Sequence, residues 1–140
     1  PTGNEGLDAS LIKIIPECKN KGIRFSYVIF GKPVQIDSME MGSLMNNLLC
    51  NALDACIDLH REKEIDLRIW THENMLEIEL ENTVRESVFD RNPQMISHKG
   101  KKELHGFGLK TIYSIVKAYS GEYYYWEEDG KFCQNIYLNL

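Results

Sequence analysis

The sequence has no run of apolar residues long enough to cross a lipid bilayer, and no signal-peptide pattern follows its first residue, Pro1. At 140 residues the chain has the size of one domain and is too short for two independent cores. We therefore expect a single unit without a membrane span, and we expect it to be a piece of a longer protein.

Metal-binding cysteine patterns are also missing. The four cysteines are Cys18, Cys50, Cys56 and Cys133. They form no CxxC pair and have no histidine nearby at ligand spacing, which argues against a zinc site. Free thiols suit a reducing compartment, so we expect all four to be buried and unpaired.

Basic charge is scarce in this chain. It has 16 Lys and Arg residues against 21 Asp and Glu, which gives a net charge of −5. A protein that binds duplex nucleic acid needs a basic patch to replace the counterions around phosphates, so we expect no nucleic-acid partner. A polyphosphate ligand is compatible with this charge, because magnesium can neutralise the phosphates locally.

The first part of the chain combines a helical and a strand pattern. Apolar residues at helical spacing predict a helix from Leu7 to about Lys21, which Pro16 kinks or ends and Gly22 stops. Its expected inward residues are Leu7, Leu11, Ile14, Ile15 and Cys18. Residues 23–30 are rich in aromatic and β-branched side chains and predict a strand, and the turn signal at 31–33 predicts the start of a hairpin.

The middle of the chain begins with a capping pattern. Asp37 and the acidic residue three positions later predict the start of a long helix that runs to about His60. Residues 65–70 and 76–80 alternate between apolar and polar side chains, which predicts a hairpin. The periodicity then disappears over residues 83–104, and irregular segments of this length usually have a function.

The last part predicts a helix over residues 107–120 and a closing hairpin. Gly121 stands where a glycine C-cap belongs, and the strands 122–126 and 132–138 flank the turn Asp129-Gly130. The expected inward helical residues are Leu109, Ile112, Ile115 and Val116. Hairpins interleaved with helices predict an α/β fold, a two-layer sandwich in which about five or six strands are covered on one face by about three helices.

Four polar residues form a stripe on the second predicted helix. Asn47, Asn51, Asp54 and Asp58 are spaced 4, 3 and 4 apart, so they share one face. Neutral amide oxygens at the edge of a core can bind a hard cation without adding charge that repels phosphate. The alternative is a solvated polar face, which the stripe taken alone favours.

A second motif, His105-Gly106-Phe107-Gly108-Leu109, follows the irregular segment at the expected start of a helix. Glycines there let the backbone approach a phosphate, while free N–H groups at the helix N-terminus point towards it. The alternative is that glycine is needed at the helix entry for steric reasons only.

Together the two motifs resemble those of a known superfamily. The run from Asn47 to Ala55 resembles the N box, and residues 105–109 resemble the G2 box, of the GHKL superfamily, which contains gyrase, Hsp90, MutL and the histidine kinases. The resemblance extends over nearly the whole chain and is closest to sensor kinases of the peptide quorum-sensing type. It implies a Bergerat-type sandwich that binds ATP and Mg²⁺.

The resemblance also implies roles by position. Asn51 would be the principal Mg²⁺ ligand, Asn47 a second polar contact to metal or phosphate, and Asp54 at most a partner in the outer layer of the site. Residues 105–109, which are His105, Gly106, Phe107, Gly108 and Leu109, would form the phosphate-binding segment. For His105 the alternative is packing at the hinge of the irregular segment.

Two further contacts rest on positions where the sequence departs from the superfamily pattern. The adenine-binding G1 box normally reads Asp-x-Gly-x-Gly, whereas the strand here ends in Glu81-Asn82-Thr83 without a glycine pair. Quorum-type kinases share this departure, so Asn82 resembles the adenine contact, and the alternative is an asparagine that only turns the chain. Lys99 resembles a lysine that pairs with the γ-phosphate, and the alternative is a charge that only keeps the segment soluble.

Asn47 also separates two reactions. Hydrolysing members of the superfamily carry a glutamate general base at this position, and an amide cannot take a proton from water. Phosphoryl transfer to histidine needs no such base, because an imidazole nitrogen attacks with its own lone pair. None of the chain's histidines lies on a long dimerisation helix, so the phosphoacceptor is expected outside these residues.

The resemblance therefore implies the ATP-binding catalytic domain of a two-component sensor histidine kinase. Its partners would be the dimerisation and phosphoacceptor domain of the same protein and, indirectly, a response regulator. Such kinases are bacterial membrane-anchored homodimers with cytoplasmic catalytic domains, and residues 83–104 would act as a lid over ATP. The alternatives are an ATPase that serves as a conformational switch and a degenerate nucleotide-binding domain used for docking.

Overall fold

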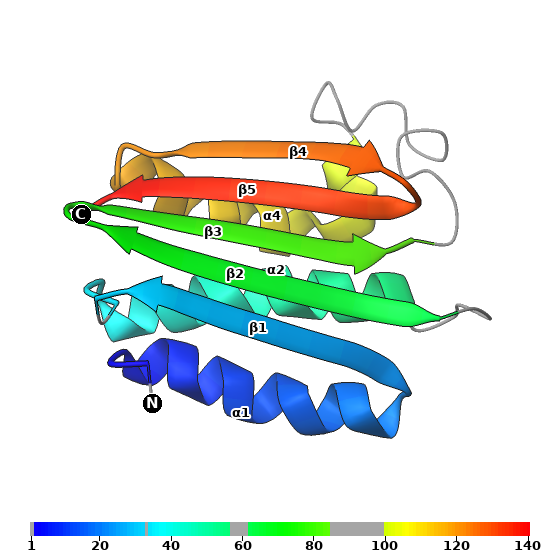
Figure 1. The fold of residues 1–140 in the computed structure, drawn as a ribbon. Coiled ribbons are helices and arrows are strands. Elements are labelled where there is room, and N and C mark those ends of the chain that lie inside the picture. Colours follow the sequence, from blue (N-terminus) through cyan, green and yellow to red (C-terminus); the bar gives the residue numbers. More distant parts are fainter. Residues whose placement is uncertain (1, 33, 57–61, 85–99) are drawn as a thin grey trace.

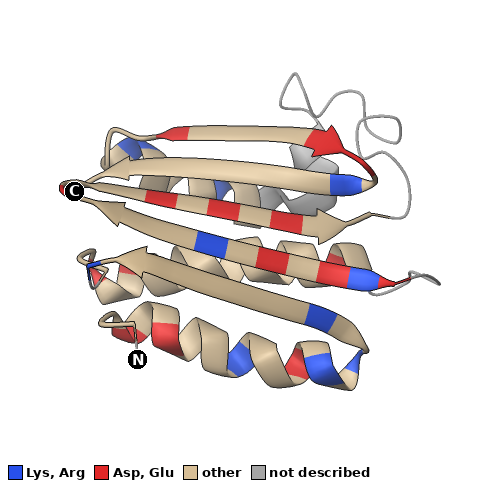
Figure 2. Ribbon diagram, viewed as in Figure 1, with Lys and Arg blue, Asp and Glu red and all other residues tan. Residues whose placement is uncertain are grey.

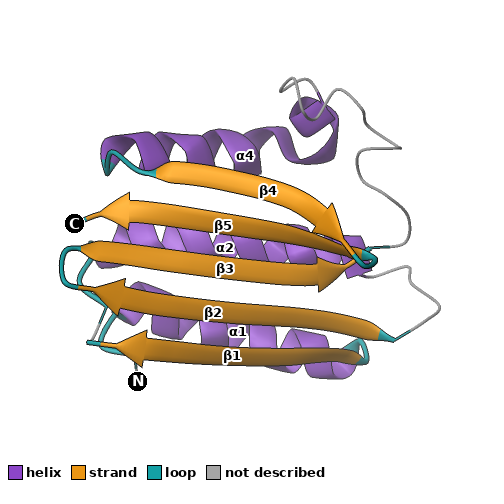
Figure 3. Cartoon of the chain, turned by 45° about the horizontal axis from the view of Figure 1, so that its top comes forward, coloured by secondary structure: helices purple, strands orange, loops and turns teal. Residues whose placement is uncertain are grey.

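The computed structural model describes residues 2–32, 34–56, 62–84 and 100–140, and for residues 100–107 it describes the backbone only. In chain order the elements are α1 (Glu5–Asn20), β1 (Ile23–Gly31), α2 (Ser38–Cys56), β2 (Lys63–His72), β3 (Met75–Thr83), α4 (Gly100–Ala118), β4 (Glu122–Glu128) and β5 (Lys131–Asn139). The strands form one sheet, and the helices cover one of its faces (Figures 1 and 3). The predicted α/β two-layer sandwich is confirmed. No helix within these ranges is both long and apolar enough to span a membrane.

The sheet has the strand order β1-β2-β3-β5-β4. Two of the three predicted hairpins are confirmed, since β2 pairs antiparallel with β3 and β4 pairs antiparallel with β5. Asp129 and Gly130 have φ angles of 52° and 76°, as a tight hairpin turn with two left-handed residues requires. The hairpin predicted to start at residues 31–33 is wrong, because β1 pairs parallel with β2 and α2 forms the crossover between them.

The core lies between the sheet and the helices, and α2 is at its centre. This helix contacts α1 on one flank, α4 on the other, and β2 and β3 beneath it. Its fully buried side chains include Met41, Leu44, Met45 and Leu48. Burying a side chain of this size stabilises the fold by about 1.5–3 kcal/mol, so α2 is firmly positioned. The predicted end of this helix near His60 lies outside the described residues.

The N-terminus of α1 is fixed by a buried asparagine. The side-chain oxygen of Asn4 accepts a hydrogen bond from the backbone N–H of Leu7 at 3.0 Å, as an N-cap does. The side-chain nitrogen of Asn4 donates to the backbone oxygen of Ile36 at 2.8 Å. This one side chain therefore starts α1 and ties it to the segment that leads into α2.

Pro16 does not end α1, which continues to Asn20. Proline lacks the N–H that would bond to the carbonyl of Ile12, but both residues lie on the exposed side of the helix, where water replaces the missing partner. Ile15, expected in the core, also lies on that side and is 41% exposed. The other four predicted inward residues of this helix are buried.

The C-terminus of α4 uses serine where glycine was expected. Ser120 adopts the left-handed conformation with a φ of 51°, and the N–H of Gly121 donates to the carbonyl of Val116 at 2.8 Å. Gly121 is required for a different reason, because a Cβ atom there would lie 2.0 Å from the backbone oxygen of Tyr137. The predicted glycine C-cap is therefore displaced by one residue.

The cysteines differ in their exposure. Cys18, Cys56 and Cys133 are buried as predicted, but Cys50 is exposed, which contradicts the expectation that all four lie in the core. Cys50 follows Leu49 on α2 and lies just outside the apolar face of that helix. None of the four cysteines forms a disulfide.

The face of the sheet without helices carries a group of ion pairs. Arg68 of β2 lies there 3.1 Å from Glu79 and 3.2 Å from Glu81, and Asp66 lies 3.8 Å away on the same strand. Figure 2 shows these acidic positions along β2 and β3. Because side chains alternate along a strand, the residues between these acids point to the helical layer.

Candidate functional site

The site begins with two asparagines on α2. Asn47 and Asn51 are half-buried on this helix, whereas Asp54 of the same stripe is exposed. Asp58 lies outside the described residues. The side-chain nitrogen of Asn47 donates to the backbone oxygen of Ser43 at 2.7 Å, one turn earlier. This bond directs the amide nitrogen back along the helix.

Gly108 of α4 faces both asparagines. A Cβ atom added to Gly108 would lie 3.1 Å from Oδ1 of Asn47 and 3.4 Å from Nδ2 of Asn51. The first separation is tight and the second is an ordinary contact, so a side chain at this position would press mainly on Asn47. The structure therefore brings the two sequence motifs together, with the backbone of Gly108 close to both amides.

The start of α4 corrects the expected position of the glycines. The helix begins at Gly100, so residues 100–104 are helical and not part of an irregular segment. Lys101, Lys102, Glu103 and Leu104 are good helix formers, which explains the earlier start. Gly106 and Gly108 thus lie inside the helix, and the predicted free N–H groups of a helix N-terminus do not belong to them.

Some predicted site residues fall where the structure gives no side-chain position. Lys99 and the proposed lid before it lie outside the described residues, and of His105, Gly106 and Phe107 only the backbone is described. Leu109 is described, and it is buried in the core. Its position beside Gly108 therefore anchors this turn of α4 to the sheet.

Asn82 lies at the edge of the same region, on the helix-facing side of β3. It follows the buried residues Ile78 and Leu80 at the two-residue spacing of one strand face, and it is only 1% exposed. Its side-chain nitrogen donates to the backbone oxygen of Thr83 at 3.1 Å. Asn82 lies near the end of β3 and pairs with Ile65 of β2.

Thr83 is a positioning residue that the sequence reasoning missed. Its hydroxyl accepts a hydrogen bond from the backbone N–H of Glu64 at 2.8 Å and lies 3.7 Å from the sulfur of Cys56. These contacts tie the end of α2 and the start of β2 to the residue that follows Asn82. In the sequence, the only signal for this contact is a threonine that directly follows an asparagine at the end of a predicted strand.

A groove of about 460 Å³ lies between α2 and α4. Ser43 lies one turn before Asn47, and Thr111 lies one turn after Gly108, so the groove begins beside the site. It is lined by Met39, Glu40, Ser43, Lys110, Thr111, Ser114 and Ile115. Its surface is mainly apolar, and neither asparagine lines it.

The arrangement suits a ligand that brings its own negative charge. Within the described residues no group of three or more His, Cys, Asp or Glu side chains could hold a metal ion. Two neutral amides can supply oxygen ligands to Mg²⁺, which also takes oxygens from a bound phosphate and from water. The donor set therefore fits a magnesium ion shared with a phosphate ligand better than a metal held by protein groups alone.

Comparisons with known proteins agree with this fold. The family model for the GHKL domain matches residues 36–139. The catalytic domain of histidine kinase ThkA superimposes with a TM-score of 0.76 at 12% identity, over 96% of this chain and 90% of that one. Mycobacterial sensor histidine kinase MprB gives a TM-score of 0.69 at 17% identity, over 96% and 93%.

A third similar structure, histidine kinase AdeS of Acinetobacter baumannii, gives a TM-score of 0.72 at 12% identity. The match covers 96% of this chain and 62% of that one. No curated protein matches the sequence. At these identities the likeness shows the fold alone, and it is the Bergerat-type fold of histidine kinase catalytic domains.

Proposed function

Because this chain belongs to the GHKL domain family, we propose that it binds Mg-ATP as the catalytic domain of a sensor histidine kinase. The observation that carries the proposal is the apposition of Gly108 to Asn47 and Asn51 across two packed helices. The fold places Asn82 on the same side of the sheet, beneath the helical layer. The site thus has polar groups at both ends and an open glycine position between them.

Each described residue has a specific role in this proposal. Asn51 and Asn47 would hold Mg²⁺ through their amide oxygens, with Asp54 outside them, and the ion would neutralise the phosphates. The side-chain oxygen of Asn82 accepts a hydrogen bond from the amino group of adenine, and the buried position of Asn82 shields this bond from water. Gly108 lets the phosphates approach α4, because no side chain fills the space before the asparagines.

The residues at the site favour phosphoryl transfer over hydrolysis. Asn47 stands where a hydrolysing enzyme needs a general base, and its amide nitrogen already donates to the carbonyl of Ser43. No group at this position can take a proton from water. The γ-phosphoryl group is therefore passed to a histidine in a separate dimerisation and phosphoacceptor domain, whose imidazole attacks with its own lone pair.

The finer assignment rests on the strand end at Asn82. The absence of glycine after Glu81-Asn82-Thr83 resembles the peptide quorum-sensing type of kinase, and we assign the chain to that type. The full protein would then be a bacterial membrane-anchored homodimer with this domain in the cytoplasm. It would serve a response regulator indirectly, through its phosphohistidine.

Calorimetric titration with a non-hydrolysable ATP analogue tests the metal assignment. We expect saturable binding that magnesium strengthens, and we expect Asn51→Ala to lose the magnesium dependence. Asn46→Ala is the matched control, because Asn46 lies on the same helix but faces α1, where it accepts a hydrogen bond from Ser10 at 3.1 Å. Equal affinities of the Asn51→Ala variant and the wild type in magnesium would refute the assignment.

A phosphate-release assay separates the kinase from the ATPase alternative. The isolated chain is expected to bind ATP without steady release of phosphate, because it has no base at Asn47 and no acceptor histidine. Steady turnover that Asn51→Ala abolishes would instead identify a hydrolysing member of the family. Absence of any nucleotide binding at millimolar concentration would leave the docking-module alternative.

A further inference from the structure

The outer edge of β1 is an unpaired strand edge. β1 is the first strand in the sheet order, and no hydrogen bond among the described residues joins its outer edge to another element. Its nine residues include no proline and only one charged side chain, Arg24. The opposite edge, β4, carries Glu122, Glu127 and Glu128. Charges of this kind protect a sheet edge from further pairing, and β1 lacks that protection.

Exposed apolar side chains accompany this edge on both faces of the sheet. Tyr27 and Val28 are 44% and 45% exposed, and Phe30, which stacks on Trp70 at 5.4 Å, is 43% exposed. Tyr27 points to the helical side and Val28 to the other, because neighbouring residues alternate. Exposed apolar side chains beside an unpaired strand edge favour the addition of a further strand.

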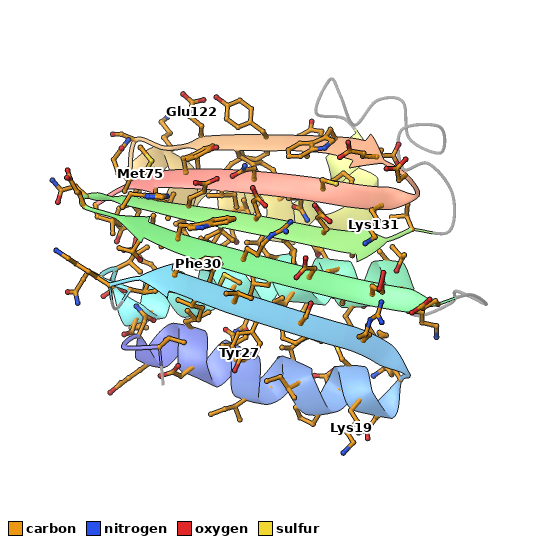
Figure 4. All side chains as sticks on the ribbon, in the orientation of Figure 1. Lys19, Tyr27, Phe30, Met75, Glu122 and Lys131 are labelled. Carbon is orange, nitrogen blue, oxygen red and sulfur yellow. The ribbon has the colours of Figure 1, made fainter. Side chains whose placement is uncertain are left out.

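Helix α1 lies beside the outer edge of β1, on the helical side of the sheet. Leu11 and Cys18 point to the sheet, and Ser10 points to α2 through its bond to Asn46, which leaves Ile12 and Ile15 on the side away from α2. Figure 1 shows that α1 lies along β1 at this end of the sheet, and Figure 4 shows Tyr27 between the two. Ile12 is 73% exposed. An added strand would therefore rest on apolar side chains of α1.

A second copy of this chain does not fit this edge. Two paired β1 strands lie about 5 Å apart, whereas packed helices need about 8–10 Å between their axes. If two copies paired through β1 about a two-fold axis, both α1 helices would lie on the same face of the joined sheet. Each α1 extends beyond the edge of its own β1, so it would lie under the partner's β1 and collide with the partner's α1. The occupant must be an extended strand that brings no helix of its own.

We propose that β1 and α1 form a docking site for an extended segment of a partner protein, which adds a sixth strand antiparallel to β1. Alternate apolar side chains of that segment pack on Tyr27 and Ile15. Lys19 lies at one end of this site (Figure 4), whereas Arg24 of β1 already pairs with Glu62 and Glu64. Acidic residues at the C-terminal end of the segment therefore complement Lys19. This inference is independent of nucleotide binding.

A peptide-binding experiment tests the site. The probe is a fluorescein-labelled peptide of the same length as β1, with alternating valine and threonine residues and two C-terminal glutamates. We expect saturable binding when fluorescence anisotropy is measured. Ile15→Glu is expected to lower the affinity by about tenfold, because one apolar contact of about 1.4 kcal/mol is lost. Lys19→Glu is expected to weaken binding and to reverse its salt dependence.

The matched control is Tyr124→Glu on the opposite edge, where Tyr124 is 50% exposed. This variant is expected to bind the peptide with the affinity of the wild type. In the wild type, peptide binding is expected to slow amide hydrogen exchange in β1 and to leave exchange in β4 unchanged. No saturable binding by the wild type at about 1 mM peptide would overturn the proposal. So would equal loss of affinity in Tyr124→Glu, or slowed exchange in β4 in place of β1.

Discussion

Substitution of Gly6 by alanine is expected to destabilise the fold strongly, although alanine is the better helix former. Gly6 lies where α1 crosses the start of α2, and a Cβ atom there would lie 1.9 Å from the backbone oxygen of Ser38 and 2.7 Å from the backbone nitrogen of Gly42. Both neighbours are backbone atoms of a helix and cannot rotate away. The helices must therefore separate at their crossing.

The size of the effect follows from these distances. Carbon and oxygen atoms need at least about 3 Å, so α1 must move by about 1 Å, which loosens the contacts of Leu7 and Leu11 in the core. Overpacking of this kind costs about 1–3 kcal/mol and sometimes more, while alanine in a helix gains about 1 kcal/mol over glycine. Because the clash with Ser38 is severe, we expect a cost of about 3–4 kcal/mol, and therefore a net loss of about 2–3 kcal/mol in the free energy of unfolding.

Urea unfolding followed by circular dichroism measures this loss, with Gly42→Ala as the matched control. A Cβ atom at Gly42 would lie 3.4 Å from the Cα atom of Gly6, which is an ordinary contact. This variant is expected to keep or slightly raise the stability of the wild type, through the helix propensity of alanine. A Gly6→Ala variant as stable as the wild type, or a control that loses as much, would refute the close crossing of the two helices.

Three further predictions concern the site and the thiols. Gly108→Ala is expected to weaken nucleotide binding in a calorimetric titration without lowering the urea midpoint, because the added Cβ presses on side-chain amides and not on backbone. Cys50 alone is expected to react rapidly with a maleimide in the folded chain, as counted by mass spectrometry, since the other three thiols are buried. Burial raises the pKa of Cys18 and Cys133 from 9.0 to about 11 and also raises the pKa of Tyr123, so the unfolded state loses these protons first. The free energy of unfolding should then be constant up to about pH 9 and fall as the pH rises towards 11, as urea titrations across this range would show.

The parts of the fold that follow from local patterns could be predicted from the sequence. The hairpins around residues 73 and 129 and the apolar face of α2 have the expected positions, because alternation and helical spacing are set within a few residues. The cap at Asp37 is likewise local, and its carboxylate accepts a hydrogen bond from the backbone N–H of Glu40 at 2.9 Å. The meeting of Asn47 with Gly108 followed from the resemblance to GHKL motifs and not from either spacing alone.

Features that depend on distant contacts could not be predicted in the same way. Residues 31–33 signal a turn, but whether the next strand pairs parallel or antiparallel with β1 depends on α2 crossing over the sheet. Pro16 is tolerated because its face of α1 is exposed, which only the packing of that helix decides. Gly121 is kept free of a side chain by Tyr137, a residue on a different element. In each case the deciding neighbour is remote in the sequence.

The position of the site depends on close approaches to both flanks of α2. On one flank Gly6 brings the backbone of α1 against Ser38, and on the other Gly108 brings α4 against Asn47. The first approach involves backbone atoms and the packed core, so a side chain there must alter stability. The second involves side-chain amides that are half exposed, so a side chain there alters what the amides can hold. Glycine therefore permits close packing of two helices on one side of α2 and leaves room for a ligand on the other side.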